Sequence, residues 1–149
     1  MTDLPIATRV HRQGTWTGPA AEIELSYDDR FLRRKRLSAG EISFLVDLPE
    51  TTSLNHGDAF ELTDGRYVEV TAAPEPLLAV TGADLTRFAW HIGNRHTPCQ
   101  IEAGRLLIRE DHVLADMLRG LGAEIAPVTA PFTPEGGAYG HGRTLPHAH

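Results

Sequence analysis

The spacing of the hydrophobic residues changes near residue 75, and this change restricts the chain to an α+β fold. Up to about Ala73, hydrophobic and polar residues alternate, so that Ile42, Phe44 and Val46, for example, fall on one face of an extended segment. Glycine, asparagine and aspartate separate the alternating stretches, as they do at the turns of β-hairpins. Residues 1–75 are therefore predicted to form a small β-rich N-terminal domain.

The second half of the chain alternates strand patterns with helix patterns. Leu85, Phe88 and Ile92 follow the helical spacing of three to four residues, and a second helix with the same spacing follows Asp111. The predicted elements are a strand over 77–80, a helix over 84–97, a hairpin over 100–102 and 106–109, a helix over 111–122 and a strand over 124–129. This β-α-β-β-α-β order is that of a ferredoxin-like domain, which we assign to residues 76–131.

Two prolines mark the boundary between the predicted domains. Pro74 and Pro76 fix φ and lack an N–H, so we expect them to break the sheet ladder near residue 75. A further change follows at the C-terminal end, where residues 132–149 are rich in glycine and proline and show no periodicity. We therefore predict a flexible C-terminal tail over 132–149 that is mobile beyond about Gly136.

The composition argues against several classes of function. The 14 basic and 20 acidic residues give a net charge of −6, which disfavours binding to nucleic acid. No apolar run approaches the roughly 20 residues of a membrane span, so no membrane association is expected, and no signal peptide is visible. A single cysteine, Cys99, fits a reducing cytoplasm. No nucleophile, base and orienting group can be grouped together, so we do not expect an enzyme.

The apolar side of the first predicted helix ends in a histidine. His96 lies 11 residues after Leu85, which places it about 20° from Leu85 around a helix that turns ~100° per residue. Two interpretations are open. In one, His96 hydrogen-bonds a carbonyl at the helix end and complements the helix dipole. In the other, His96 ligates a metal opposite its own copy in a homodimer, because a two-fold axis supplies the same residue twice.

Further metal-ligand candidates lie around the second predicted helix. His112 is at the start of that helix, where the dipole favours the neutral imidazole that binds metal. Glu110, two residues earlier, is a weaker candidate that would add a carboxylate oxygen. His91 is also a weaker candidate, because it lies about 140° from His96 around the first helix and the two cannot ligate one ion from one chain.

Two histidines close the chain. His147 and His149 form a short tract of the kind that captures metal on a flexible end. Two imidazoles alone bind weakly, so the tract is useful chiefly where it closes onto ligands fixed elsewhere. Cys99, three residues after His96, is a minor ligand candidate. Imidazole nitrogens with a few oxygens suit nickel, copper or zinc.

A basic run stands out in the first half. Residues 30–36 carry five arginine or lysine side chains. They are typical of a solvated edge strand, whose charges discourage edge-to-edge pairing. They also fit a docking strip for an acidic partner protein, contacted through Arg33, Arg34, Lys35 and Arg36. In that second interpretation the protein is an interaction adaptor and its metal binding is incidental.

Several of these segments together resemble the family of the urease accessory protein UreE. The segments are Gly-Asn-Arg-His at 93–96, Asp-His-Val-Leu-Ala-Asp-Met-Leu at 111–118, Gly-Gly-Ala-Tyr-Gly-His-Gly-Arg at 136–143, Asp-Arg-Phe-Leu-Arg-Arg-Lys-Arg at 29–36 and Asp-Leu-Pro at 47–49. The resemblance implies a homodimeric, cytoplasmic nickel metallochaperone that delivers Ni²⁺ for assembly of the urease metallocentre. Its implied partners are the urease apoprotein and the accessory activation complex. The implied domains are one similar to a peptide-binding domain and a ferredoxin-like metal-binding domain.

The resemblance also implies roles for individual residues. It makes His96 the nickel ligand at the dimer interface, paired with its symmetry mate, and His112 a secondary metal ligand. Some relatives carry a histidine where this chain has Glu110. The tail is shorter than the long histidine-rich tails of some members, which implies few nickel ions per dimer rather than a store. Cu²⁺ and Zn²⁺ are expected to compete in vitro.

Overall fold

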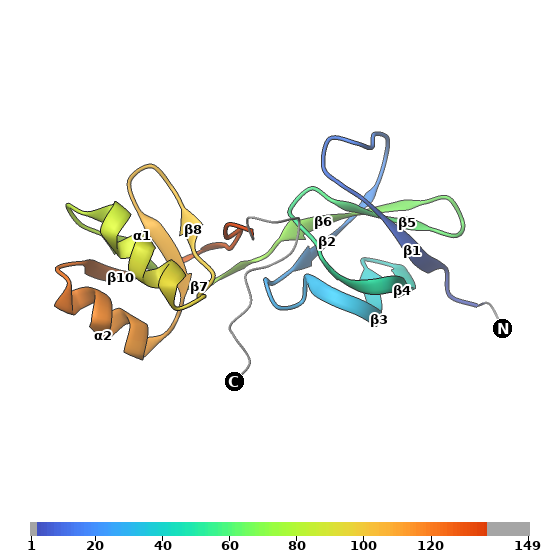
Figure 1. The fold of residues 1–149 in the computed structure, drawn as a ribbon. Coiled ribbons are helices and arrows are strands. Elements are labelled where there is room, and N and C mark those ends of the chain that lie inside the picture. Colours follow the sequence, from blue (N-terminus) through green and yellow to red (C-terminus); the bar gives the residue numbers. More distant parts are fainter. Residues whose placement is uncertain (1–2, 137–149) are drawn as a thin grey trace. The chain divides into compact units, whose positions relative to one another are not determined.

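The structure is a computed structural model that describes residues 3–136 (Figure 1). It divides into two compact units between Ala73 and Pro74. The N-terminal unit contains a six-stranded sheet, and the C-terminal unit contains a four-stranded sheet and two helices. The predicted α+β class is therefore confirmed. Within the described residues, neither helix is long and apolar enough to cross a membrane.

Strands β1 to β6 form the sheet of the N-terminal unit in the order β2-β6-β5-β1-β4-β3. Their bounds are β1 Ile6–His11, β2 Ala21–Leu25, β3 Phe31–Ala39, β4 Ile42–Ser53, β5 Ala59–Leu62 and β6 Tyr67–Ala72. The pairs β3–β4 and β5–β6 are the antiparallel hairpins that the alternating pattern predicts. The pairs β1–β4 and β2–β6 are parallel. Period-two alternation tells which residues share a face but not which strands pair, so it did not reveal these parallel pairs.

The alternation does decide which side chains enter the core of this unit. Phe44, Val46 and Leu48 on β4 are buried, whereas the intervening Leu45 and Asp47 are partly exposed. Burying one such apolar side chain contributes about 1.5–3 kcal/mol to folding. The packed core of the unit consists of 14 buried residues, drawn from all six strands and from Leu54.

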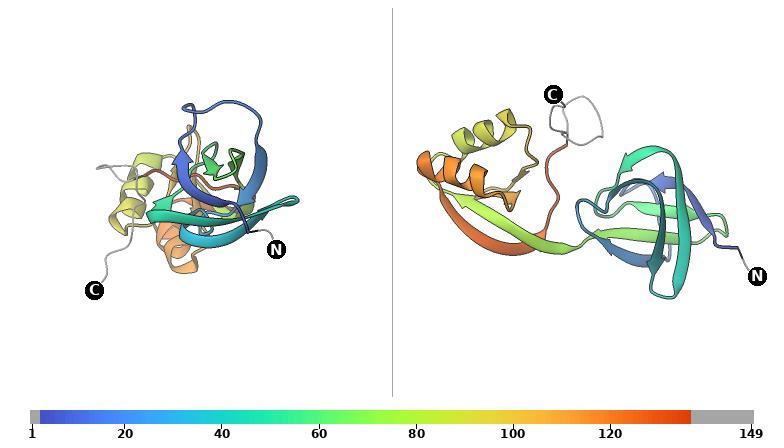
Figure 2. Two further views of the ribbon diagram at one scale, coloured as in Figure 1. Left: turned by 90° about the vertical axis from the view of Figure 1, so that its right-hand side faces the viewer. Right: turned by 90° about the horizontal axis from the view of Figure 1, so that it is seen from below.

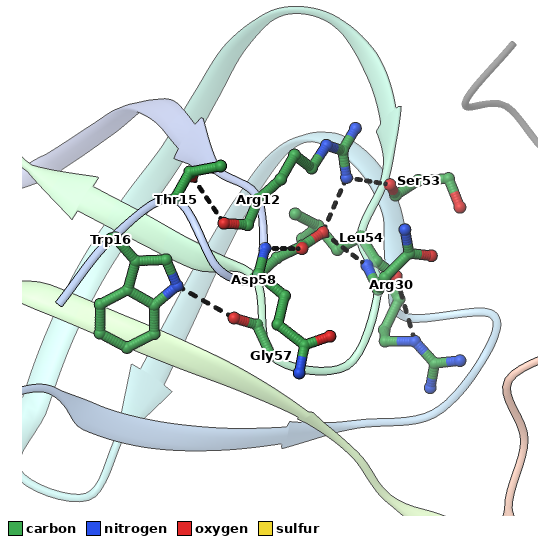
Figure 3. A network of polar contacts seen from close by, with 10 residues as sticks. Arg12, Thr15, Trp16, Arg30, Ser53, Leu54, Gly57 and Asp58 are labelled. Carbon is green, nitrogen blue, oxygen red and sulfur yellow. Dashed lines mark hydrogen bonds and ion pairs between the residues drawn. The ribbon is translucent and has the colours of Figure 1, made fainter.

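A buried carboxylate joins two loops of the N-terminal unit (Figure 3). Asp58 is 1% exposed. Its oxygens accept hydrogen bonds from the side chain of Arg12 at 2.7 Å and from the backbone N–H groups of Gln13 at 2.9 Å and Asn55 at 2.8 Å. A buried carboxylate is tolerated only when it is paired and hydrogen-bonded in this way. The network ties the loop after β1 to the turn before β5.

The basic run does not behave as one surface. Arg30 is only 2% exposed, and its guanidinium donates to the backbone oxygens of Leu54 at 3.2 Å and Leu25 at 2.9 Å. Leu32 is buried as well. The exposed part of the run is therefore 33–36, not the whole of 30–36, because Arg30, directly before β3, and Leu32 on β3 are both buried.

Strands and helices of the C-terminal unit follow the predicted β-α-β-β-α-β order. Their bounds are β7 Pro74–Thr81, α1 Leu85–Asn94, β8 Gln100–Ile101, β9 Leu106–Arg109, α2 His112–Gly120 and β10 Glu124–Pro131. The sheet has the order β10-β7-β9-β8, and every pair in it is antiparallel. Both helices lie on one face of this sheet (Figure 2). This is the ferredoxin-like arrangement expected from the sequence.

Both helices begin at an aspartate and bury the predicted apolar stripe. The side chain of Asp84 accepts from the N–H of Arg87 at 3.3 Å, and that of Asp111 accepts from Leu114 at 3.0 Å. Such N-caps contribute about 1 kcal/mol each. Phe88 and Ile92 of α1 pack with residues of α2 and of the sheet, and the buried members of this core are Val80, Phe88, Ile92, Leu106, Ile108, Leu114, Leu118 and Ala123.

The two prolines do not break the sheet ladder as predicted. Strand β7 begins at Pro74 and pairs with β10 from that residue onwards. On its other side, β7 pairs with β9 only from Leu77. Neither Pro74 nor Pro76 therefore has to donate a hydrogen bond to β9, and the sheet tolerates both at its border.

Residues 132–136 are not a loose start of the predicted tail, and we call them the strap. Phe132 is fully buried. The backbone N–H of Thr133 donates to the side-chain oxygen of Gln100 at 2.8 Å, and that of Glu135 donates to the carbonyl of Cys99 at 2.9 Å. Mobility is predicted only beyond about Gly136 and stays a prediction. The rest of the predicted tail, 137–149, lies outside the described residues.

Candidate metal centre

His96 does not lie on the helix stripe where the sequence placed it. Helix α1 ends at Asn94, and the backbone of His96 has φ +56°, in the left-handed region. The N–H of His96 donates to the carbonyl of Gly93 at 2.9 Å, and the N–H of Thr97 donates to that of Ile92 at 3.4 Å. These two bonds form a Schellman motif, in which the first residue beyond the cap is left-handed and is usually glycine. The predicted helix over 84–97 is too long because this motif reverses the chain.

The second helix of the same unit ends in the same way but with the usual residue. The N–H of Gly122 donates to Arg119 at 3.0 Å and that of Ala123 donates to Leu118 at 3.0 Å, with φ +98° at Gly122. His96 and Gly122 thus occupy equivalent positions. A side chain in this conformation costs on the order of 1 kcal/mol that glycine avoids. His96 is also the one residue other than glycine with positive φ among residues 3–136. Such local strain is typical of functional positions.

His112 and His96 lie at the same end of the helix pair. Strands β7 and β8 both run antiparallel to β9, so α1 ends, and α2 begins, at the same end of the sheet. The side chain of His112 is 83% exposed, and its Nε2 lies 4.0 Å from a carboxylate oxygen of Asp116, one turn along α2. Among the described residues, no three histidine, cysteine, aspartate or glutamate side chains come close enough together to hold one ion.

The minor candidates have separate surroundings. His91 is half-buried on α1, and its ring meets the ring of Trp90 edge-on at 5.0 Å between centroids. Glu110 is exposed directly before the cap of α2. Burial, together with the smaller effect of the charge of Glu135, raises the pKa of the Cys99 thiol to about 11. Cys99 therefore stays protonated at neutral pH, which does not suit a metal ligand.

Large exposed hydrophobic side chains of the described residues all belong to the C-terminal unit. Trp90 is 63% exposed, Val113 62% and Ile101 55%. Trp90 lies four residues before the end of α1, and Val113 is the second residue of α2. Val113 is therefore at the end of the helix pair where His96 and His112 lie, whereas Trp90 lies in the middle of α1.

The remaining predicted site residues are the basic side chains and the tail histidines. Arg33, Arg34, Lys35 and Arg36 are four successive exposed residues on β3, the edge strand of its sheet. Arg34 and Lys35 lie 3.7 Å from carboxylates of Asp47 and Asp29, in exposed pairs that contribute little. The predicted ligands His147 and His149 lie outside the described residues.

Sequence reasoning missed two features of this region, although one signal was present. Pro98 lies three residues after the cap residue Arg95, and proline shortly beyond a helix end cannot continue the helix. It limits the helix to residues before Pro98 but does not reveal the reversal at His96. The role of Gln100 as the acceptor for Thr133 had no signal in the sequence, because it depends on contact between residues 33 positions apart.

Comparison with known proteins covers both units of the chain. The N-terminal domain family of the UreE urease accessory protein matches residues 5–73, and the C-terminal domain family matches residues 75–149. A urease accessory protein UreE from Cereibacter sphaeroides is 68% identical over all of this chain and 82% of its own length. Proteins of the same name from Ruegeria pomeroyi and Rhodobacter capsulatus are 64% and 62% identical, over 99% and 96% of this chain and 99% and 92% of their own lengths. The chain therefore belongs to the UreE family of urease accessory proteins.

Proposed function

We propose that this protein carries nickel and delivers it for assembly of the urease metallocentre. Membership of the urease accessory family supports a role in urease maturation. The observation that carries the metal assignment is the backbone of His96, which is held in a left-handed conformation at the end of α1 where glycine would be more stable. A fixed imidazole at a chain reversal is suited to binding a borderline metal ion such as Ni²⁺.

The carrier we propose is a homodimer in which His96 of each copy ligates the same ion. Three exposed hydrophobic side chains in the unit that carries His96 support a contact with a second copy. A two-fold axis would place each His96 opposite its mate. In this arrangement His112 is a secondary ligand. His147 and His149 complete the coordination shell of the ion and leave it when nickel is transferred to a partner. Glu110 and His91 are weaker candidates for this role.

This proposal treats nickel as cargo and assigns the protein no catalytic step of its own. The partners we propose are the urease apoprotein and its accessory activation complex, in the cytoplasm. We expect Cu²⁺ and Zn²⁺ to bind the same imidazoles in vitro, because the donor set does not exclude them. For nickel to be released, the ligands of a partner protein must replace the tail histidines in the coordination shell of the ion. We therefore expect this shell to be incomplete without the tail histidines.

The test is calorimetric titration of nickel into the full chain and into His96→Gly, with the oligomeric state measured in parallel by light scattering. For the wild type we expect one tight ion per dimer, or about half an ion per chain. His96→Gly should lose this ion and stay folded, since glycine fits the left-handed backbone. His56→Ala is the control, because it removes a histidine of the N-terminal unit that is not a proposed ligand and should keep the tight ion. Tight binding that survives in His96→Gly would contradict the proposed site.

A second candidate function is docking of an acidic partner through residues 33–36. Four successive exposed basic side chains on an edge strand favour it, because arginine binds carboxylates in a bidentate manner. In the double variant Arg33→Glu and Arg34→Glu, we expect partner binding to fall at least tenfold (about 1.4 kcal/mol) while nickel binding is unchanged. Binding of the urease complex would be measured by interferometry at two salt concentrations. Unchanged docking would leave β3 with only the protective role of a charged edge strand.

A further inference from the structure

The strands β2, β6, β5 and β1 are neighbours in the sheet of the N-terminal unit, and one face of them is acidic. Alternation along each strand sends side chains such as Ile23, Val68 and Val70 into the core, so the residues between them point to the outer face. On these four strands, the side chains that are charged at neutral pH all point to this face. They are Glu22, Glu24, Glu61, Glu69 and Arg9, and we call this surface the acidic face.

Two of these glutamates are direct neighbours across the sheet. Glu22 on β2 is in register with Glu69 on β6, and adjacent strands lie about 4.8 Å apart. Like charges placed opposite each other destabilise a sheet. Within residues 3–136, no basic side chain forms an ion pair with Glu22, Glu24 or Glu69. Folding alone does not require this pair, so its negative charge fits a role in binding.

Two aromatic rings border the acidic face, and we call Trp16 and Tyr67 the aromatic ledge. Tyr67 on β6 is paired with Glu61 on β5, so both side chains point to the outer face. The ring of Trp16, from the loop after β1, lies 5.8 Å from the ring of Tyr67 between centroids and is tilted by 46°. Both rings are partly exposed. The aromatic ledge therefore offers ring surface to a ligand beside the carboxylate of Glu61.

The loop that carries Trp16 is fixed in place. The indole N–H of Trp16 donates to the carbonyl of Gly57 at 3.0 Å (Figure 3). The start of the loop is anchored at the buried Asp58 through the side chain of Arg12 and the backbone N–H of Gln13. Groups that are ordered before binding lose little conformational entropy when a partner docks. The aromatic ledge is therefore preorganised for a ligand.

Glu61 presents a charged oxygen next to the aromatic ledge. Its Oε1 accepts from the hydroxyl of Tyr67 at 3.3 Å and lies 2.9 Å from Nε2 of His11. Within residues 3–136, both of these contacts involve Oε1, and the side chain of Glu61 is 33% exposed. The hydrogen bond with His11 lowers the pKa of Glu61, so this carboxylate is ionised at neutral pH. Its second oxygen can therefore accept from a cationic donor outside the chain.

We propose that the acidic face and the aromatic ledge form a docking surface for an arginine-rich segment of a partner protein. The planar guanidinium of arginine stacks on aromatic rings and donates two hydrogen bonds to one carboxylate, so it matches both features of this surface. The ammonium of lysine is a compact, strongly hydrated charge that forms no such fork. The proposal is independent of the nickel-carrier function, because none of the proposed metal ligands takes part.

The test is an NMR titration of the full chain with the peptide Arg-Ser-Arg-Ser-Arg, blocked at both ends. The chain has two tryptophans, so two indole N–H signals are followed. Trp90, which is 63% exposed on α1 of the other unit, is the internal control. We expect the signal of Trp16 to shift until the site is saturated, while the signal of Trp90 stays in place. A titration in which Trp16 does not shift, or shifts no more than Trp90, would overturn the proposal.

The charge of the acidic face is tested by the double variant Glu22→Gln and Glu69→Gln. We expect the dissociation constant of the peptide to rise about five- to tenfold, and Trp16→Ala should have a similar effect. The matched control is Glu41→Gln with Glu50→Gln, which removes the same charge from two exposed positions outside the acidic face. This control should change the dissociation constant by less than about twofold. Equal weakening in the two double variants would show attraction by net charge alone and would overturn the proposal.

Two further measurements separate docking from a structural role. Without peptide, the double variant Glu22→Gln and Glu69→Gln should melt at a higher temperature than the wild type, because it removes a pair of like charges. A lower melting temperature would show that these glutamates serve the fold and would overturn their role in docking. A peptide with lysine in place of arginine should bind several-fold more weakly to the wild type. Equal binding of the two peptides would overturn the assignment of arginine.

Discussion

At the scale of single residues, the turns after α1 and α2 can be compared directly, because they differ in the residue at the left-handed position. Both helices end in a Schellman motif, and the left-handed position is His96 in one and Gly122 in the other. The backbone hydrogen bonds are the same, so the difference lies in the side chain. Retaining histidine where glycine is more stable is a cost that fits a residue kept for its imidazole.

We predict that His96→Gly is more stable than His96→Ala by about 1 kcal/mol, because both lack the imidazole and only alanine strains the left-handed backbone. Guanidinium unfolding of the metal-free proteins measures this difference. Gly122→Ala is the matched control and should lose a similar amount. A Cβ at Gly122 would meet nothing within 4 Å, so its cost would come from the backbone alone. Equal stability of the two His96 variants would show that the turn is not strained.

At the scale of elements, one polar cluster links three strands of the N-terminal unit. His11 of β1 lies 2.9 Å from a carboxylate oxygen of Glu61 on β5, and Tyr67 of β6 donates to the same oxygen at 3.3 Å. The rings of His11 and Tyr67 stack at 5.3 Å. The hydrogen bond with His11 lowers the pKa of Glu61 below its ordinary value of 4.5, although partial desolvation opposes this effect.

This lowered pKa gives a testable dependence of stability on pH. Because the folded state favours ionised Glu61, its contribution is fully present above pH 4.5 and is lost as the pH falls through the lower pKa of the folded state. We predict that Glu61→Gln is less stable than the wild type at pH 6 and that the difference shrinks below pH 4.5. Urea unfolding at a series of pH values measures it. Glu41→Gln, an exposed change in the turn after β3, should show no such trend, and a gap independent of pH would refute the assignment.

The elements also show where pattern reasoning succeeds. The two helices and their buried stripes were predicted because the helical period is local, and the caps at Asp84 and Asp111 were read from short side chains in the right place. The end of α1 was placed three residues too late. There the apolar spacing continued to His96 by coincidence, while the Schellman motif had already reversed the chain.

At the scale of the whole molecule, nickel capture and release should depend on pH through the imidazoles. Imidazole must be neutral to bind metal, and an ordinary histidine has a pKa of about 6.5. With two imidazoles on one ion, affinity should fall by about 100-fold for each unit of pH well below that value, against about tenfold for a single imidazole. Titrations of nickel against a competing chelator between pH 5 and 8 measure how steeply the affinity depends on pH. Tight binding retained at pH 5 would exclude histidine ligation.

The sequence by itself determined the α+β class, the β-α-β-β-α-β order of the C-terminal unit and the buried stripes of its two helices, because hydrophobic period and turn residues are local properties of the chain. It also indicated His96, through the resemblance of its surroundings. Only the tertiary structure decided that β1–β4 and β2–β6 run parallel, that Arg30 is buried away from the rest of its basic run, and that His96 sits in a left-handed turn. It alone placed Thr133 and Gln100 together, since residues far apart in the chain meet only when the sheet that joins them has formed.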